Sequence, residues 1–126
     1  MKSGSLINHY TLLLSIFLLS EGIWGLFSYT VFAFMTTNLT HAVIHIALGI
    51  TGIFLAINHK TYGYCLIVGS LLAVVGAMYM IPATRAIIVK LLNVNEAVAV
   101  FNVVAGGFAL LVAYAGERYV QVKHHH

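Results

Sequence analysis

The stretch YTLLLSIFLLSEGIWGLFSYTVFAFM, residues 10–35, decides the class of fold because it contains only one charged residue, Glu21. A helix needs about 20 apolar residues to cross a bilayer, so this run predicts a membrane span. It follows Lys2 as a signal peptide would, but it continues past the length of such a segment and no small-residue cleavage site follows. We therefore interpret it as an uncleaved first span.

The composition of the whole chain agrees with this interpretation. Of the 126 residues, 61% are hydrophobic and 7% are charged, against roughly 45–50% and about 25% in soluble domains. So few charges cannot cover a protein in water, and six basic residues are too few to form a phosphate-binding patch. The composition excludes a soluble domain, a disordered chain and a nucleic-acid-binding protein.

Three further apolar runs predict spans at about residues 40–57, 62–81 and 96–115. Pro82, the only proline, ends the third span, and the stretch 83–92 is too short to cross a membrane. This stretch contains Arg85 and Lys90, which is typical of a short interfacial helix. We predict an all-α membrane protein, a four-transmembrane-helix bundle forming one domain over residues 1–123, with residues 124–126 as the remnant of a purification tag.

The basic residues predict the direction of the chain in the membrane. Four of the six lie on the side of the termini, namely Lys2, Lys60, Arg118 and Lys123. Basic residues are enriched on the cytoplasmic side of membrane proteins, so both termini are expected in the cytoplasm.

The second and fourth spans form a weak internal repeat at an offset of 57 residues. Asn38, Ala42, His45, Gly49, Gly52 and Ala56 align with Asn95, Ala99, Asn102, Gly106, Ala109 and Ala113. Steps of four and three place each set on one helix face, and small residues allow membrane helices to approach closely. The repeat predicts two helix hairpins with the second and fourth spans at the bundle centre. Gly49, Gly52, Gly106 and Ala109 are the expected packing residues.

The segment from Asn38 to Gly49, NLTHAVIHIALG, resembles the N-x-x-H-x-x-x-H-x-x-x-G motif of a bacterial family of small four-helix membrane proteins catalogued as a domain of unknown function. The family's last helix has a histidine where this chain has Asn102. The resemblance implies a four-helix protein of the bacterial inner membrane, and it implies no particular activity.

Glu21 is the most unusual residue, because an ionised carboxylate inside a bilayer costs a few kcal/mol or more. The predicted span places it near the middle of the membrane, at the depth of Thr51 and roughly 10 Å deeper than His45 at about 1.5 Å per residue. We therefore expect no direct Glu21–His45 ion pair, and Thr51 or a water is the expected partner. The alternatives are a neutral glutamic acid bonded within the bundle and a proton-relay or cation-binding group.

His41 and His45 lie four residues apart, which puts both imidazoles on one helix face. Glu96 begins the fourth span on the same side of the membrane, so a zinc site of His41, His45 and Glu96 is one hypothesis. The other has His41 at the water interface and His45 hydrogen-bonded to Asn102 or Asn95. Haem b needs axial ligands on facing helices, which these two histidines cannot supply within one bundle.

No phosphate-binding glycine loop, Ser-His-Asp arrangement or carboxylate pair occurs in the sequence, so no enzyme activity and no cofactor is predicted. The interpretation is a structural or accessory helix bundle in the lipid bilayer, forming a homo-oligomer because four short helices shelter the polar side chains only partly. The alternatives are a small transporter or channel with Glu21 and His45 along a polar path, and a metal- or haem-binding protein.

Overall fold

The computed structural model describes residues 5–124 of the chain, and the side chains of residues 6–115. The predicted all-α bundle is confirmed, since five helices make up most of the described residues. Lys2, His125 and His126 lie outside the described residues. The elements are α1 (Ser5–Gly25), β1 (Thr30–Val31), β2 (Met35–Thr36), α2 (Leu39–Ile57), α3 (Tyr62–Met80), α4 (Pro82–Leu92) and α5 (Glu96–His124).

Four helices are long and apolar enough to cross a membrane, as the sequence predicts. The spanning segments are Leu6–Gly25, Leu39–Ile57, Tyr62–Met80 and Glu96–Ala115. Large apolar side chains cover the outside of these helices, while the buried residues include Asn8, Thr11, Ser15, Glu21 and Asn102. Polar groups inside and apolar groups outside are what a bilayer requires, because the solvent there is hydrocarbon. The chain is a small integral membrane protein.

The first span differs from its prediction of residues 10–35. The helix α1 begins at Ser5 and ends at Gly25, and the chain then forms the antiparallel pair β1–β2, in which Val31 faces Met35. Phe32 and Ala33 make the turn with positive φ angles of 53° and 69°. Aromatic and β-branched residues favour strands, and hydropathy alone does not separate them from a span. The shift moves Glu21 from the middle of a span to four residues before the end of α1.

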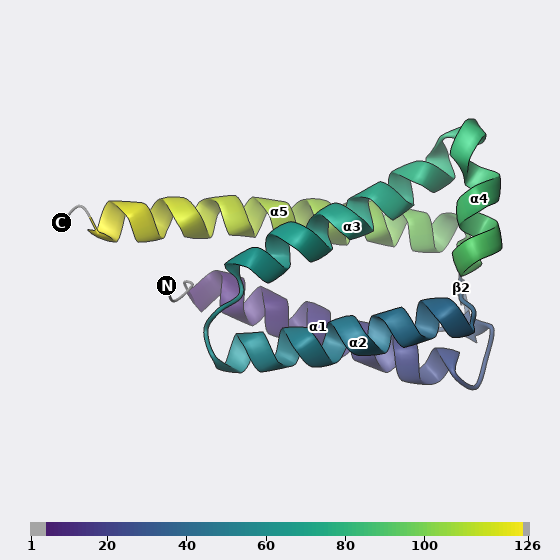
Figure 1. Ribbon diagram of the computed structural model, residues 1–126, viewed down its shortest axis with the longest axis horizontal. Helices are drawn as coiled ribbons and strands as arrows, with labels where there is room; N and C mark the ends of the chain where they lie inside the picture. Colours follow the sequence, from purple (N-terminus) through teal and green to yellow (C-terminus); the bar gives the residue numbers. More distant parts are fainter. Residues whose placement is uncertain (1–4, 125–126) are drawn as a thin grey trace.

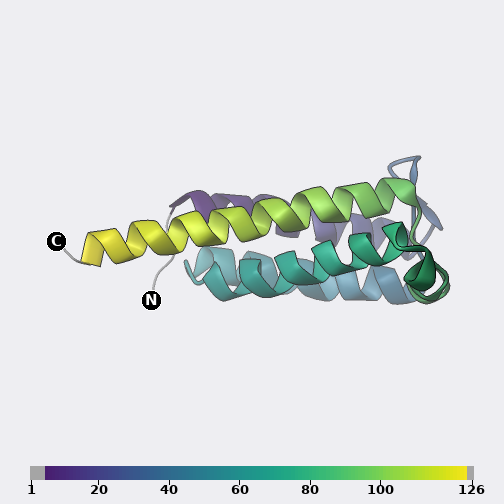
Figure 2. The same ribbon diagram turned by 90° about the horizontal axis from the view of Figure 1, so that it is seen from above.

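The helices associate in two pairs. The closest packing in the described chain joins α1 to α2 and α3 to α5, and Figures 1 and 2 show all four helices running along one long axis. The expectation that the second and fourth spans meet at the bundle centre is wrong, because α2 and α5 do not approach each other closely in the described residues. Each of these helices packs its small residues against its own partner instead.

The small residues lie at these two helix contacts. A Cβ atom added to Gly49 of α2 would be 2.7 Å from the backbone nitrogen of Leu19 in α1. One added to Gly106 of α5 would be 2.5 Å from the carbonyl oxygen of Gly69 in α3. Ala109 also lies against Gly69, and Gly52 lies against Ser15 and Tyr64. Direct backbone approach of this kind replaces the hydrophobic effect as the packing force in membranes.

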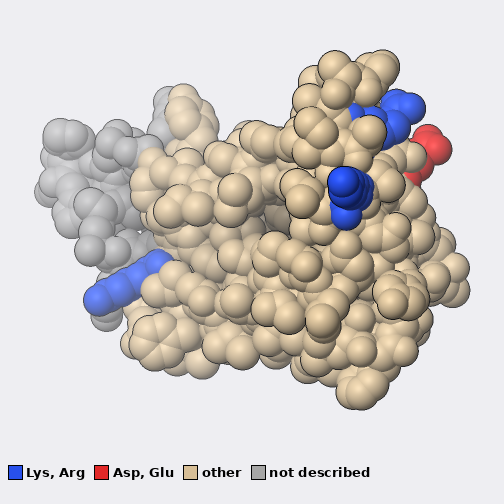
Figure 3. All heavy atoms as spheres, turned by 45° about the vertical axis from the view of Figure 1, so that its right-hand side comes forward, with Lys and Arg blue, Asp and Glu red and all other residues tan. Residues whose placement is uncertain are grey.

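The short helix α4 lies across one end of the bundle (Figure 1). It begins at Pro82, directly after its N-cap residue Ile81. Proline is tolerated at the first position of a helix because the N–H that it lacks would have no hydrogen-bond partner within the helix. The predicted short helix is therefore present, and its residues Arg85 and Lys90 are exposed while Ile88 is buried. Figure 3 shows basic side chains at this end and a broad uncharged surface along the face in view.

Candidate functional site

The centre of the site is a contact between Glu21 of α1 and His45 of α2. Glu21 Oε1 lies 2.9 Å from His45 Nδ1, and both side chains are at most 4% exposed. The expectation of no direct pair is therefore wrong. That expectation was based on a first span that continues to residue 35. Because α1 ends at Gly25, Glu21 lies four residues from that helix end, and His45 lies six residues from the start of α2. At about 1.5 Å per residue the two are level to within about 3 Å.

His41 lies one turn before His45 on the same face of α2. Its ring meets the His45 ring edge to face, with centroids 4.1 Å apart and an angle of 72° between the planes. His41 Nδ1 is 3.0 Å from the carbonyl oxygen of Leu92, and its backbone N–H donates to Asn38 Oδ1 at 2.9 Å, which caps α2. The side chain is 2% exposed, so the expected position at the water interface is wrong. The C-terminal end of α4 lies over it.

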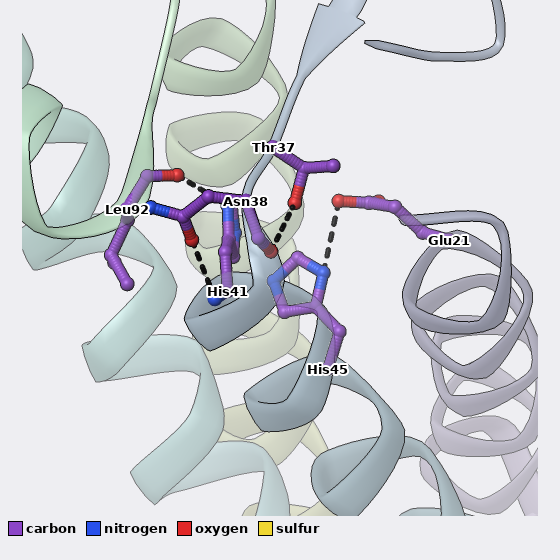
Figure 4. A network of polar contacts seen from close by, with 6 residues as sticks. All are labelled: Glu21, Thr37, Asn38, His41, His45 and Leu92. Carbon is purple, nitrogen blue, oxygen red and sulfur yellow. Dashed lines mark hydrogen bonds and ion pairs between the residues drawn. The ribbon is translucent and has the colours of Figure 1, made fainter. Parts of the chain in front are cut away.

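Glu21, His41 and His45 together form a buried cluster of three side chains of the types that ligate metals (Figure 4). One carboxylate oxygen and one ring nitrogen from each histidine lie within 4.8 Å of one another. Glu21 Oε2 has no hydrogen-bond partner, and His45 Nδ1 has only the contact with Glu21. Buried polar atoms are nearly always paired, so these atoms can accept a further partner such as a water or a cation.

The structure joins Glu21, and not Glu96, to the two histidines. Glu96 is exposed at the start of α5 and lines a surface groove with Phe34 and Phe101. The sequence hypothesis placed Glu96 in the site because it opens the fourth span on the correct side of the membrane. The packing of α1 on α2 brings the carboxylate of Glu21 there instead.

The remaining predicted polar residues lie away from this cluster. Thr51 is exposed on the outside of α2, so it cannot serve as the buried partner of Glu21. Asn102 is 1% exposed and its Oδ1 has no hydrogen-bond partner, while Asn95 Nδ2 donates to the carbonyl oxygen of Phe34 at 2.9 Å. Neither asparagine makes the predicted hydrogen bond to His45, whose contact is with Glu21.

The donor set of the cluster suits a borderline divalent metal such as zinc. Zinc binds imidazole nitrogen and carboxylate oxygen at about 2.0–2.2 Å, and two donors on one tetrahedral ion are about 3.4 Å apart. The three donors lie within 4.8 Å of one another, at most about 1.4 Å beyond that spacing. Haem does not fit between the histidines, because rings 4.1 Å apart leave no space for a porphyrin plane.

Leu92, the last residue of the short helix α4, and Asn93, which caps it, contribute to the site in a way that the sequence did not predict. The carbonyl oxygen of Leu92 contacts His41, and the amide of Asn93 donates to the carbonyl oxygen of Thr37 at 2.7 Å. The sequence could have predicted the helix end at Asn93, because Asn often takes the left-handed conformation that ends a helix. Its partner 56 residues away was not predictable from that preference.

No family model, curated protein or solved structure matches this chain. The protein is therefore described by its fold and by the residues of its candidate site. It is an integral membrane protein of two packed helix pairs, with a buried Glu–His–His cluster between the first two helices.

Proposed function

We propose that this protein binds a divalent transition-metal ion, of which zinc is the first to test, through Glu21, His41 and His45. The observation that carries the proposal is the buried cluster in which Glu21 Oε2 has no hydrogen-bond partner. An unpaired oxygen in this position is unfavourable in the empty protein and becomes favourable when a cation is bound. Three protein ligands leave one coordination position open, as in zinc sites that exchange ligands.

The test is zinc binding by the purified protein in detergent, and it requires deletion of residues 124–126 because three consecutive histidines also bind zinc. Competition with a chromophoric chelator gives the stoichiometry and the affinity. We expect one zinc ion per chain, and a loss of affinity of about tenfold or more for Glu21→Gln, His41→Gln and His45→Gln.

The matched control is His9→Gln, which removes an exposed histidine near the start of α1 and leaves the cluster intact. It should bind zinc as the unaltered protein does. Absence of zinc binding, or equal binding by the cluster variants and the His9 variant, would refute the proposal. An accessory role in which the cluster only joins α1 to α2 would then be the better interpretation.

We also propose a location in the bacterial inner membrane with both termini in the cytoplasm. The excess of basic residues on the side of the termini supports this orientation. A Cys65→Ala background with Lys60→Cys or Arg85→Cys tests it by labelling intact bacteria with a membrane-impermeant thiol reagent. We expect labelling at position 85 in intact cells and at position 60 only after disruption, and the reverse pattern would refute the orientation.

A further inference from the structure

The last turn of α4 and the residues that join it to α5, together residues 91–95, are bonded to the start of α2 and to the residues just before it, from Phe34 on. Five side-chain hydrogen bonds join the two regions, and they come from separate residues. They are Asn38 Nδ2 to Leu91 O at 3.0 Å, His41 Nδ1 to Leu92 O at 3.0 Å, Thr36 Oγ1 to Asn93 O at 2.6 Å, Asn93 Nδ2 to Thr37 O at 2.7 Å and Asn95 Nδ2 to Phe34 O at 2.9 Å.

Asn93 holds this segment in place. It caps the C-terminus of α4 in the left-handed conformation, with φ 51° and ψ 50°, and it makes one hydrogen bond through its side chain and one through its carbonyl oxygen. The last carbonyl groups of a helix have no partner within the helix. The turn at Asn93 therefore leaves the carbonyl oxygen of Leu92 available, and His41 is its partner.

The hydrogen bond to Leu92 determines which nitrogen of His41 can bind a metal. A carbonyl oxygen only accepts, so Nδ1 of His41 carries the hydrogen and the lone pair of the neutral ring is on Nε2. Metal-binding histidines usually donate their second ring N–H to a carbonyl or a carboxylate, which fixes the ring orientation and the tautomer.

We infer that the Leu92 carbonyl group, held by Asn93, positions His41 as a metal ligand through Nε2. The inference rests on the proposed metal binding, and it assigns to Asn93 a positioning role at a site that it does not touch. The connection between α4 and α5 thereby couples the second helix pair to a site formed by the first.

The test compares Asn93→Gly with Asn58→Gly in the protein lacking residues 124–126. Glycine at position 93 keeps the left-handed backbone accessible and removes the side-chain amide. Asn58 is the matched control, because it also caps a helix and its Nδ2 donates to Phe54 O at 2.8 Å, at the other end of α2. Nitrogen-15 NMR of the histidine rings without metal reports the His41 tautomer, and chelator competition reports zinc affinity.

We expect the Nδ1–H tautomer at His41 in the unaltered protein and in Asn58→Gly, and a mixture of tautomers in Asn93→Gly. Zinc affinity should fall about tenfold in Asn93→Gly and remain unchanged in Asn58→Gly. The Nε2–H tautomer in the unaltered protein would overturn the inference whether or not zinc binds.

The two variants also separate this inference from the proposed function. Equal zinc affinities in Asn93→Gly and Asn58→Gly would overturn the positioning role and leave the metal site intact. If no form binds zinc but Asn93→Gly alone alters the His41 tautomer, the metal site is refuted and the positioning of His41 by Asn93 is supported.

Discussion

Gly49 and Gly107 are interior glycines of two membrane helices, and replacing each with alanine tests the packing of α1 on α2. At Gly49 the new Cβ would lie 2.7 Å from the backbone nitrogen of Leu19 and 2.8 Å from the carbonyl oxygen of Ser15. At Gly107 it would meet no atom within 4 Å. The contacts at Gly49 are to backbone, so no side-chain rotation relieves them and the two helices must separate.

The expected magnitudes follow from these contacts. Overpacking of this kind destabilises a protein by about 1–3 kcal/mol. Gly107→Ala should stabilise by about 0.5–1 kcal/mol, since alanine loses less backbone entropy than glycine when a helix forms. The two variants should therefore differ by about 1.5–4 kcal/mol in the free energy of unfolding.

Unfolding by sodium dodecyl sulfate in mixed micelles, followed by circular dichroism, measures this difference. A lower midpoint for Gly49→Ala with an unchanged or higher midpoint for Gly107→Ala is the expected result. If Gly49→Ala were as stable as Gly107→Ala, the close approach of α1 and α2 at this position would be wrong. The level placement of Glu21 and His45 would then lose its structural basis.

Three further predictions concern contacts inside the bundle. In metal-free protein, a double-mutant cycle of Glu21→Gln and His45→Asn should give a coupling energy of about 0.6–2 kcal/mol, and additive effects would contradict the contact between these two side chains. Tyr10→Phe removes the hydrogen bond to the carbonyl oxygen of Ala105 (2.6 Å) and should lower the free energy of unfolding by about 1 kcal/mol. Tyr29→Phe, at an exposed position, should leave the free energy of unfolding unchanged. Equal effects of the two substitutions would argue against the Tyr10–Ala105 hydrogen bond. Cys65 is fully buried, so maleimide should label it only after denaturation, and rapid labelling of the folded protein would contradict the packing of Cys65 against α1 and α5.

The position of Glu21 illustrates how an error in one helix boundary changes a functional prediction. Hydropathy treats residues 26–35 as a continuation of the first span, which makes Glu21 central and separates it from His45. The chain instead turns at Phe32 and Ala33 into a short hairpin. Apolar residues that cap the end of a bundle and apolar residues that face lipid have the same hydropathy, so this boundary depends on tertiary contacts.

The third member of the cluster was beyond sequence reasoning for a related reason. The spacing of four residues is sufficient to place His41 and His45 on one face of α2. It does not say which carboxylate faces them, and the predicted spans favoured Glu96 because they placed Glu21 roughly 10 Å deeper than His45. The pairing of α1 with α2 brings Glu21 to His45 at 2.9 Å, while Glu96 stays on the surface.

Composition and hydropathy were sufficient to predict a membrane protein with four spanning helices, because the free energy of placing a segment in a bilayer depends mainly on its own residues. The stripes of small residues on α2 and α5 were also readable along the chain, since they follow helical periodicity. Which helix each stripe packs against, and which side chains it buries together, depended on contacts between segments far apart in sequence. These contacts bring the carboxylate of Glu21 together with His41 and His45.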